Sequence, residues 1–414
     1  MAHRCELALC AACGPEGHRT YRNHARGKRT TNAHLSQSRA NAFAGKLRLM
    51  TLSAGIALGD DSLRAVALGR AGGPDRLSVP PALWRSRSGG LVVGADPAGA
   101  GAVYRDFADR VGDPVPVIGS DGTARFGADL VALTVAGLLH RATQGLAPDQ
   151  LVITYPAAWG RYEVSMLHSA LGATWVNGIP AAFVSSPVAT AVSAESAGAL
   201  RAGEAALVVD IGGRRTDLAL VGGAGRARRV VTRSGTDELG STLLDRSLAA
   251  HIVAQSAIPE PDPAEPGGLA ALRDAVHRAR RARAELMHQP ATVVEVCLPA
   301  GTERVRVIRS ELDALISGPI SAGVAAIAHM LAEAHHNGTQ VAAVLLTGEA
   351  VRTPLLTELL SARIQPRALF PPDPEWTVAG AAADIAVRRA RPRHIEPPAA
   401  PRPRTAGHGL TRAA

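Results

Sequence analysis

The stretch LVVDIGGRRTDLALV, residues 207–221, carries the side chains of this sequence that are best suited to chemistry. It is typical of a strand, a turn and a second strand. The turn holds pairs of aspartates, glycines and arginines: Asp210 and Asp217, Gly212 and Gly213, and Arg214 and Arg215. Glycines at the end of a strand let backbone N–H groups approach a phosphate. The stretch therefore predicts a phosphate-binding turn, although arginines are unexpected in it.

The two arginines leave two interpretations open. Arg214 and Arg215 contact phosphates directly and replace other positive charges. Alternatively they fill the pocket and pair with Asp60, Asp61 or Glu349, so that nothing binds. In either case they cannot act as a general base, because arginine does not lose its proton.

An internal repeat indicates the elements that position this turn. Aligning AGIALGDDSLRAVAL with LVVDIGGRRTDLALV pairs Leu58 with Ile211 and Gly59 with Gly212, at an offset of 153 residues. Apolar spacing predicts a hairpin over 53–69 and helices over 126–145 and 269–288. Two strand–turn–strand units, each followed by helices, predict a duplicated α/β fold with a ligand cleft between its halves.

Composition narrows the class of protein. The net charge is +9, but residues 1–49 carry nine Lys/Arg against two Glu, and residues 388–414 carry seven Arg against one Glu. The mildly acidic body between them makes nucleic acid an unlikely partner. No window of eighteen apolar residues lacks charge, so we expect no membrane span. Four cysteines do not form a disulfide framework, which favours a reducing, cytoplasmic setting.

The two ends differ from the body. Residues 1–49 are predicted to be a disordered basic extension, and residues 391–414 a disordered Pro/Arg tail. Cys10, Cys13 and His18 have a spacing similar to that of a zinc knuckle, a less favoured alternative for the first segment.

Over residues 52–390 the chain resembles the nucleotide-binding domain of the DnaK-type heat shock protein 70 family, within the actin and sugar-kinase superfamily. The resemblance rests on motifs in the family's order: GIALGDDS, LVVGADPAG, LVITYPAAWGRYEVSMLHSALGA, VSSPVATAVSAESAG, VVDIGGRRTDLAL, SGTDELGSTLLD, LLTGEAVRTPLL and EWTVAGAAADIA. It implies an α/β, duplicated actin-like (RNase H-like) ATPase fold, with two lobes around a central nucleotide cleft. The first lobe is expected over 50–200 and the second over 201–390, with a helical lid at about 230–318.

The resemblance also implies roles for individual residues. Asp210 and Asp217 would be catalytic, and Asp210 would lie beside Mg²⁺. The residues expected to contact ATP are Gly59, Gly212, Gly213, Arg214, Arg215, Gly240, Arg283, Gly348 and Arg352.

Several positions depart from the family pattern. Two carboxylates near the metal are replaced by Ala57 and Ser186, and two threonines of the first phosphate motif by Asp60 and Asp61. The catalytic lysine is absent, because the only lysines are Lys28 and Lys46. Phosphoryl transfer depends on positive charge around the phosphates, so these changes predict weak ATP binding and slow or absent hydrolysis.

The sequence therefore predicts a stand-alone chaperone-type nucleotide-binding module with a regulatory or scaffolding role. It would act without a client-binding domain and through a protein partner that the sequence does not identify. A working ATPase in which arginine replaces lysine is an alternative. A sugar-kinase-like phosphotransferase is a further one.

Overall fold

The computed structural model of the protein describes residues 51–69, 75–94 and 102–390. The chain divides into two units between Leu49 and Met50, and all described residues belong to the second. The predictions for residues 1–49, including the zinc-knuckle alternative, and for residues 391–414 lie outside the described residues.

The first lobe is built on a five-stranded sheet. Its strands, in spatial order, are β10 (Ala181–Ser185), β9 (Gln150–Tyr155), β1 (Ser53–Leu58), β2 (Leu63–Leu68) and β3 (Asp75–Val79). β1, β2 and β3 are antiparallel neighbours, whereas β9 and β10 continue the sheet in parallel. The hairpin predicted over 53–69 is confirmed by the pairing of β1 with β2.

The second lobe repeats this topology. Its strands, in spatial order, are β13 (Arg229–Thr236), β12 (Thr216–Gly222), β11 (Ala205–Ile211), β16 (Val341–Thr347) and β17 (Arg367–Leu369). The first three are again antiparallel, and β16 and β17 again continue the sheet in parallel. β1 and β11 hold equivalent central places, which confirms the duplication predicted from the repeat.

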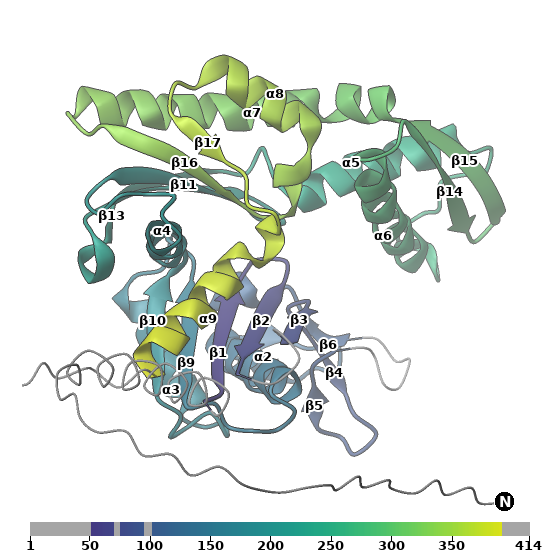
Figure 1. Cartoon of the computed structure of the whole chain (residues 1–414). Helices are drawn as coiled ribbons and strands as arrows, with labels where there is room; N and C mark the ends of the chain where they lie inside the picture. The colour runs from purple at the N-terminus through teal and green to yellow at the C-terminus, as the bar shows by residue number, and fades with distance from the viewer. Residues whose placement is uncertain (1–50, 70–74, 95–101, 391–414) are drawn as a thin grey trace, which may run out of the picture. The chain divides into compact units, whose positions relative to one another are not determined.

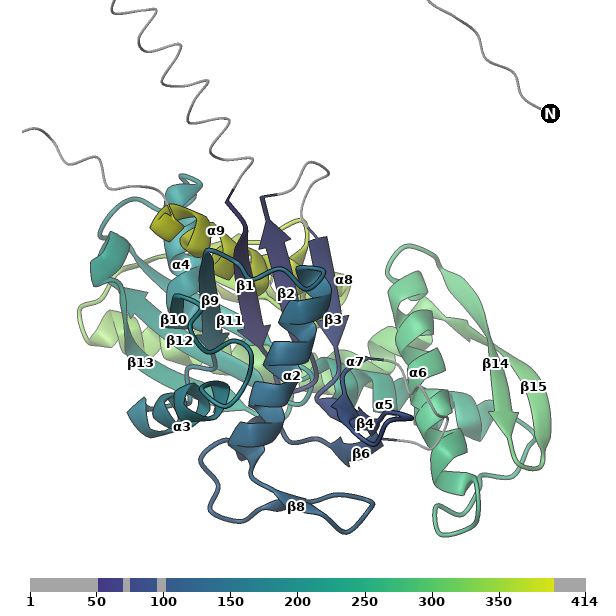
Figure 2. The ribbon, with the colours of Figure 1, turned by 90° about the horizontal axis from the view of Figure 1, so that it is seen from below.

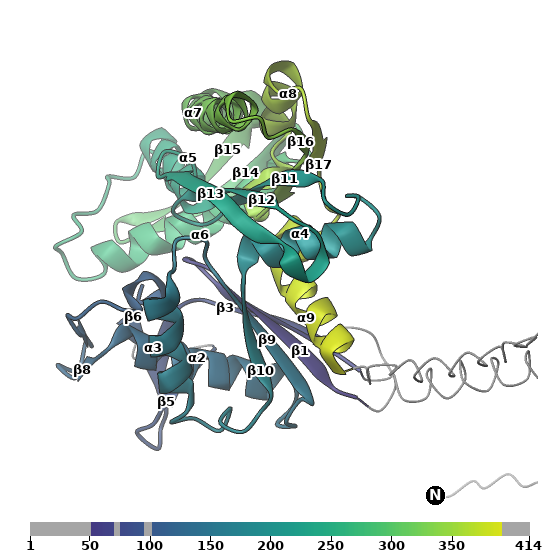
Figure 3. The same ribbon diagram turned by 90° about the vertical axis from the view of Figure 1, so that its left-hand side faces the viewer.

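Helices cover both faces of each sheet. They are α2 (Gly127–Ala142), α3 (Arg161–Leu171), α4 (Ser186–Ser196), α5 (Ser241–Gln255), α7 (Arg309–His336), α8 (Pro354–Arg363) and α9 (Thr377–Ala390). α2 packs on the first sheet, α9 covers that sheet's other face, and α4 packs on β11 and β12 (Figures 1 and 3). Central strands buried on both faces read as continuous apolar runs, as β1 and β11 do.

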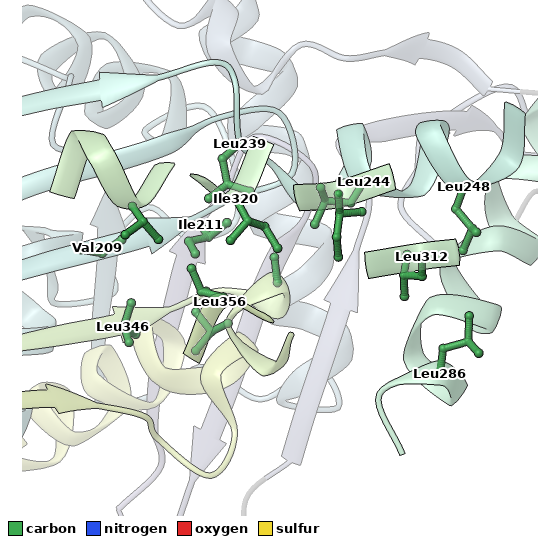
Figure 4. Packing of buried hydrophobic residues seen from close by; sticks show 14 of the residues in the cluster. Val209, Ile211, Leu239, Leu244, Leu248, Leu286, Leu312, Ile320, Leu346 and Leu356 are labelled. Carbon is green, nitrogen blue, oxygen red and sulfur yellow. The ribbon is translucent and has the colours of Figure 1, made fainter. Parts of the chain in front are cut away.

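The core of the second lobe lies between its sheet and helices α5, α7 and α8. Val209, Ile211 and Leu346 point from the strands toward Ile320 and Leu356 of the helices (Figure 4). α7 is long and apolar enough to cross a membrane by length and composition alone. One face of α7 packs in this core. A core helix of a folded protein passes the same test of length and composition, so this test is weak evidence for a membrane span.

Two smaller groups of elements extend the lobes. The first lobe carries β4 (Ala82–Arg85), β5 (Leu91–Val92), β6 (Ala102–Arg105), η1 (Ala108–Arg110), β7 (Val117–Ile118) and β8 (Ala124–Arg125). The second carries α6 (Gly268–Leu286), β14 (Ala291–Leu298) and β15 (Gly301–Ile308), which pack beside α5 (Figure 2). α6 confirms the helix predicted over 269–288. The short elements η2 (Gly225–Ala227), η3 (Glu349–Arg352) and η4 (Pro374–Trp376) complete the described part.

Candidate functional site

A cavity of about 340 Å³ lies where the turns of the two repeated hairpins meet. The β1–β2 turn contributes Gly59, Asp60 and Asp61, and the β11–β12 turn contributes Gly212 and Arg215. Six of the predicted site residues line it: Gly59, Asp210, Gly212, Arg215, Asp217 and Gly348. The duplicated fold thus brings together residues that are about 150 positions apart, as the repeat predicts.

The backbone amides of the second turn are bound by a carboxylate from the first turn. Oδ1 of Asp60 accepts a hydrogen bond of 2.9 Å from the N–H of Gly213. Oδ2 accepts one of 2.8 Å from the N–H of Arg214. Successive amides of this kind form a concave anion site, and here its anion is a side chain of the same chain.

Close backbone approach explains the glycines around this turn. A Cβ atom on Gly213 would lie 2.2 Å from the Cβ of Asp61, and one on Gly240 would lie 2.6 Å from the carbonyl oxygen of Gly213. Gly348 has φ +98°, and a Cβ there would lie 2.1 Å from the carbonyl oxygen of Ile211. These glycines let the β1–β2 turn, the start of α5 and η3 contact the β11–β12 turn directly.

Asp210 and Asp217 face each other on β11 and β12, at the cavity end of the hairpin. Burial, together with the carboxylates of Asp217 and Asp60, raises the pKa of Asp210 to about 6, against a hydrogen bond from Thr347. Burial also raises the pKa of Asp217, while its ion pair with Arg215 lowers it. Ionisation of these two carboxyl groups in their buried position therefore costs free energy.

The two arginines of the turn bind acidic residues other than the expected ones. The Arg214 guanidinium lies 3.1 Å from Asp109 of η1 in the first lobe. Nε of Arg215 donates to Asp217 at 2.9 Å, and its Nη1 lies 3.8 Å from Asp237. The alternative in which these guanidinium groups pair with Asp60, Asp61 or Glu349 is therefore wrong. Asp60 accepts from backbone amides instead, and Glu349 is bound by Arg280.

The charged partner of Glu349 comes from α6. Arg280 donates a hydrogen bond to Glu349 and also lies 4.0 Å from Asp61. Arg64 of β2 lies 3.6 Å from the other oxygen of Glu349. These four side chains form one ionic network that joins the first lobe, η3 and α6.

Five predicted nucleotide contacts lie outside the cavity lining: Gly213 and Arg214 of the turn, and Gly240, Arg283 and Arg352. Arg283 is buried and donates to Asp245 of α5 at 2.6 Å. Arg352 is held by Glu375 at 3.2 Å and by the carbonyl oxygen of Pro372 at 3.0 Å. Gly240 lies behind the turn, where the N–H groups of the next two residues donate to the carbonyls of Gly212 and Gly213.

Two positions that the resemblance places near a metal carry no carboxylate. Ala57 and Ser186 line the cavity, and the Ser186 hydroxyl donates to the carbonyl oxygen of Tyr155 at 3.0 Å. Within 51–69, 75–94 and 102–390, no three His, Cys, Asp or Glu side chains are grouped so that they could hold a metal ion. The assignment of Asp210 as the Mg²⁺ neighbour stays a prediction.

Sequence reasoning missed the role of Asp60, and it also missed Asp109 as the partner of Arg214. The sequence signal for Asp60 was available in the repeat. The alignment makes the Gly-Asp-Asp turn equivalent to the Gly-Gly turn, so the two turns face each other in a duplicated fold. An acidic side chain that faces backbone amides accepts hydrogen bonds from them, in addition to repelling phosphate.

The two sheets of equivalent topology, the two facing turns and the cavity between them define an actin-like ATPase fold. A family model described as Hsp70 protein matches residues 178–393, which is more than half of the chain. The chain therefore belongs to the Hsp70 family, whose domains bind ATP and Mg²⁺. A comparison with curated proteins finds no match.

Proposed function

We propose that this protein is a chaperone-type nucleotide-binding module that binds ATP weakly, hydrolyses it slowly or not at all, and acts in a regulatory or scaffolding role. The proposal is carried by the charge of the cavity. Among the described residues that line it, acidic side chains outnumber basic ones: Asp60, Asp61, Asp109, Glu163, Asp210, Asp217, Glu349 and Glu375, against Arg64 and Arg215.

This wall repels the phosphates of a nucleoside triphosphate. Two like charges 4 Å apart repel by about 4 kcal/mol at an effective dielectric constant of 20. The two described arginines at the wall are themselves near carboxylates, Arg64 to Glu349 and Arg215 to Asp217. Transfer of a phosphoryl group requires added positive charge, and the described cavity offers little that is not already neutralised.

Calorimetric titration of the full chain tests the proposal. ATP is expected to bind with a dissociation constant of about 1 mM or weaker, which corresponds to about −4 kcal/mol. Chelation of Mg²⁺ is expected to change this value little, since no three His, Cys, Asp or Glu side chains of the described residues are grouped so that they could hold a metal ion. ADP and phosphate release should stay at the rate of a buffer blank.

The alternative of a working ATPase is favoured by one observation, namely that Arg215 lines the cavity. If Arg215 replaces the missing lysine, wild-type protein will bind ATP tightly and only with Mg²⁺. Arg215→Ala will then weaken binding by roughly ten- to hundred-fold, the value of one charge-assisted hydrogen bond. Arg214→Ala is the matched control, because Arg214 is turned toward Asp109. That pattern, with turnover abolished by Asp210→Asn, would overturn our proposal.

A further inference from the structure

The two lobes are bridged at the turns by hydrogen bonds between a carboxylate and two backbone amides. Each oxygen of Asp60 in the first lobe accepts one N–H of the second lobe, from Gly213 and Arg214. Asp60 and Gly213 are 153 residues apart. A carboxylate that binds two successive amides supplies a negative charge and two acceptor oxygens, as a phosphate does at such a site.

A second bridge lies beside the first. Arg214 extends from the same turn of the second lobe to Asp109 of η1 in the first. The amide and the guanidinium of one residue therefore bind two different carboxylates of the opposite lobe. Both contacts must break if the β11–β12 turn is to move away from the first lobe.

The third bridge is the ionic network on the α6 side of the cavity. Glu349 of η3 is bound by Arg280 of α6 and lies near Arg64 of β2. Arg280 also approaches Asp61 of the first turn. α6 is thereby tied both to its own lobe and to the first lobe. Each of these pairs is partly shielded from water, so salt screens it less than an exposed pair.

The close fit of the turns supports the bridges. The Cα hydrogen of Gly213 is the only group that fits there, since an added Cβ would lie 2.2 Å from the Cβ of Asp61. An added Cβ on Gly212 would lie 3.0 Å from Oδ1 of Asp60. The first turn therefore occupies the space directly over the amides of the second.

We propose that Asp60 is an internal latch, a built-in substitute for a phosphate that keeps the two lobes closed without nucleotide. The inference rests on the proposed function, since a module that does not depend on ATP needs another means of holding its lobes together. ATP and Asp60 compete for the amides of Gly213 and Arg214. A partner that opens the lobes must displace Asp60.

Distance measurement between two spin labels tests the latch. The labels are placed at Ser88→Cys in the exposed β4–β5 turn and at Thr302→Cys on the exposed side of β15. The four native cysteines are replaced by serine. The nucleotide-free protein should give one narrow distance. Asp60→Ala should give a longer or broader distribution, and Asp113→Asn, at a half-buried pair outside the cleft, should match the unsubstituted protein.

Hydrogen exchange of the unsubstituted protein supplies a measurement that needs no variant. The amides of Gly213 and Arg214 should exchange roughly ten- to hundred-fold more slowly than free loop amides, in line with bonds to a charged acceptor. Asp60→Asn, which keeps the shape and loses the charge, should reduce that protection. Unprotected amides in the unsubstituted protein would overturn the latch even if Asp60→Ala failed to fold.

The failures of the two proposals can be told apart. A broad or long nucleotide-free distance contradicts the latch, while the weak ATP binding measured by calorimetry stands. Tight ATP binding to a protein that is closed before ATP is added contradicts the proposed function and leaves the latch intact. If Asp60→Ala opens the lobes, its ATP affinity should rise above that of the unsubstituted protein by roughly ten- to hundred-fold.

Discussion

Asp210 shows how the chemistry of one residue depends on its neighbours. It lies at the cavity end of β11, opposite Asp217 and near Asp60. Burial and these carboxylates raise its pKa to about 6, whereas an unfolded aspartate has a pKa near 3.9. The folded protein therefore binds a proton more readily at this site than the unfolded chain does. The stabilisation from that proton is fully present below about pH 4 and is lost as the pH rises through about 6.

Asp210→Asn should therefore stabilise the protein at pH 7.5 and have little effect at pH 4. The amide keeps the shape of the neutral acid and removes the charge that burial penalises. The expected gain at pH 7.5 is about 1–3 kcal/mol, since each pKa unit corresponds to about 1.4 kcal/mol. Denaturant unfolding of both proteins at the two pH values measures it.

Asp113→Asn is the matched control for this prediction. Hydrogen bonds from the Val115 amide and from Arg110 lower the pKa of Asp113, so its charge stabilises the fold. Asp113→Asn should therefore lower the free energy of unfolding at pH 7.5, whereas Asp210→Asn should raise it. A loss of stability in Asp210→Asn at pH 7.5 would contradict the conclusion that burial and neighbouring carboxylates disfavour the charge of Asp210.

At this scale the sequence predicted that the two turns would meet but not which side chains would bind one another. Asp60 was expected to repel phosphate, and Arg214 to contact phosphate or a nearby acid. The position of a side chain in a cavity depends on differences of a few Å between turns that lie far apart in sequence, and apolar periodicity carries no such information. Arg283 illustrates the same limit, because its partner Asp245 lies on another helix.

At the scale of elements, α9 depends on a glycine in the strand that it covers. A Cβ atom on Gly55 of β1 would lie 2.1 Å from the Ala383 nitrogen and 2.6 Å from the Ala379 carbonyl oxygen of α9. The buried face of α9 consists of alanines, which permit this close approach. The contact joins the last helix of the described chain to the first sheet.

Gly55→Ala should destabilise the protein by about 1–3 kcal/mol, the usual cost of overpacking a core. Gly380→Ala is the matched comparison within α9, because a Cβ there has no neighbour within 4 Å. That change should stabilise the helix by about 0.5–1 kcal/mol, since alanine is the better helix former. Denaturant midpoints of the two variants measure both effects, and equal midpoints would refute the tight α9–β1 packing.

Elements were more predictable than contacts for a physical reason. The hairpin of β1 and β2 and the helix α6 follow from local apolar spacing, and the equivalence of β1 and β11 follows from the repeat. The edge strand β13 could not be placed in this way. Its side chains are mostly exposed, so the sequence carries no buried face to mark it.

At the scale of the whole molecule, the start of the described chain is fastened by a pair of reciprocal bonds. The Leu52 amide donates to Oδ2 of Asp149 at 2.8 Å, and the Asp149 amide donates to the Leu52 carbonyl oxygen at 2.7 Å. These bonds align β1 with β9, its parallel neighbour. They lie just after the division of the chain between Leu49 and Met50.

Deleting residues 1–49 should leave the melting temperature unchanged, whereas deleting residues 1–53 should lower it by several degrees. The first deletion removes a segment whose composition predicts no packed core, and it keeps both bonds at Leu52. The second removes those bonds and the first residue of the central strand β1. Asp149→Ala separates the two effects, because it removes only the side-chain acceptor, a loss of about 1 kcal/mol. A melting temperature that falls by several degrees on the shorter deletion would show that residues 1–49 contribute to the fold of the body.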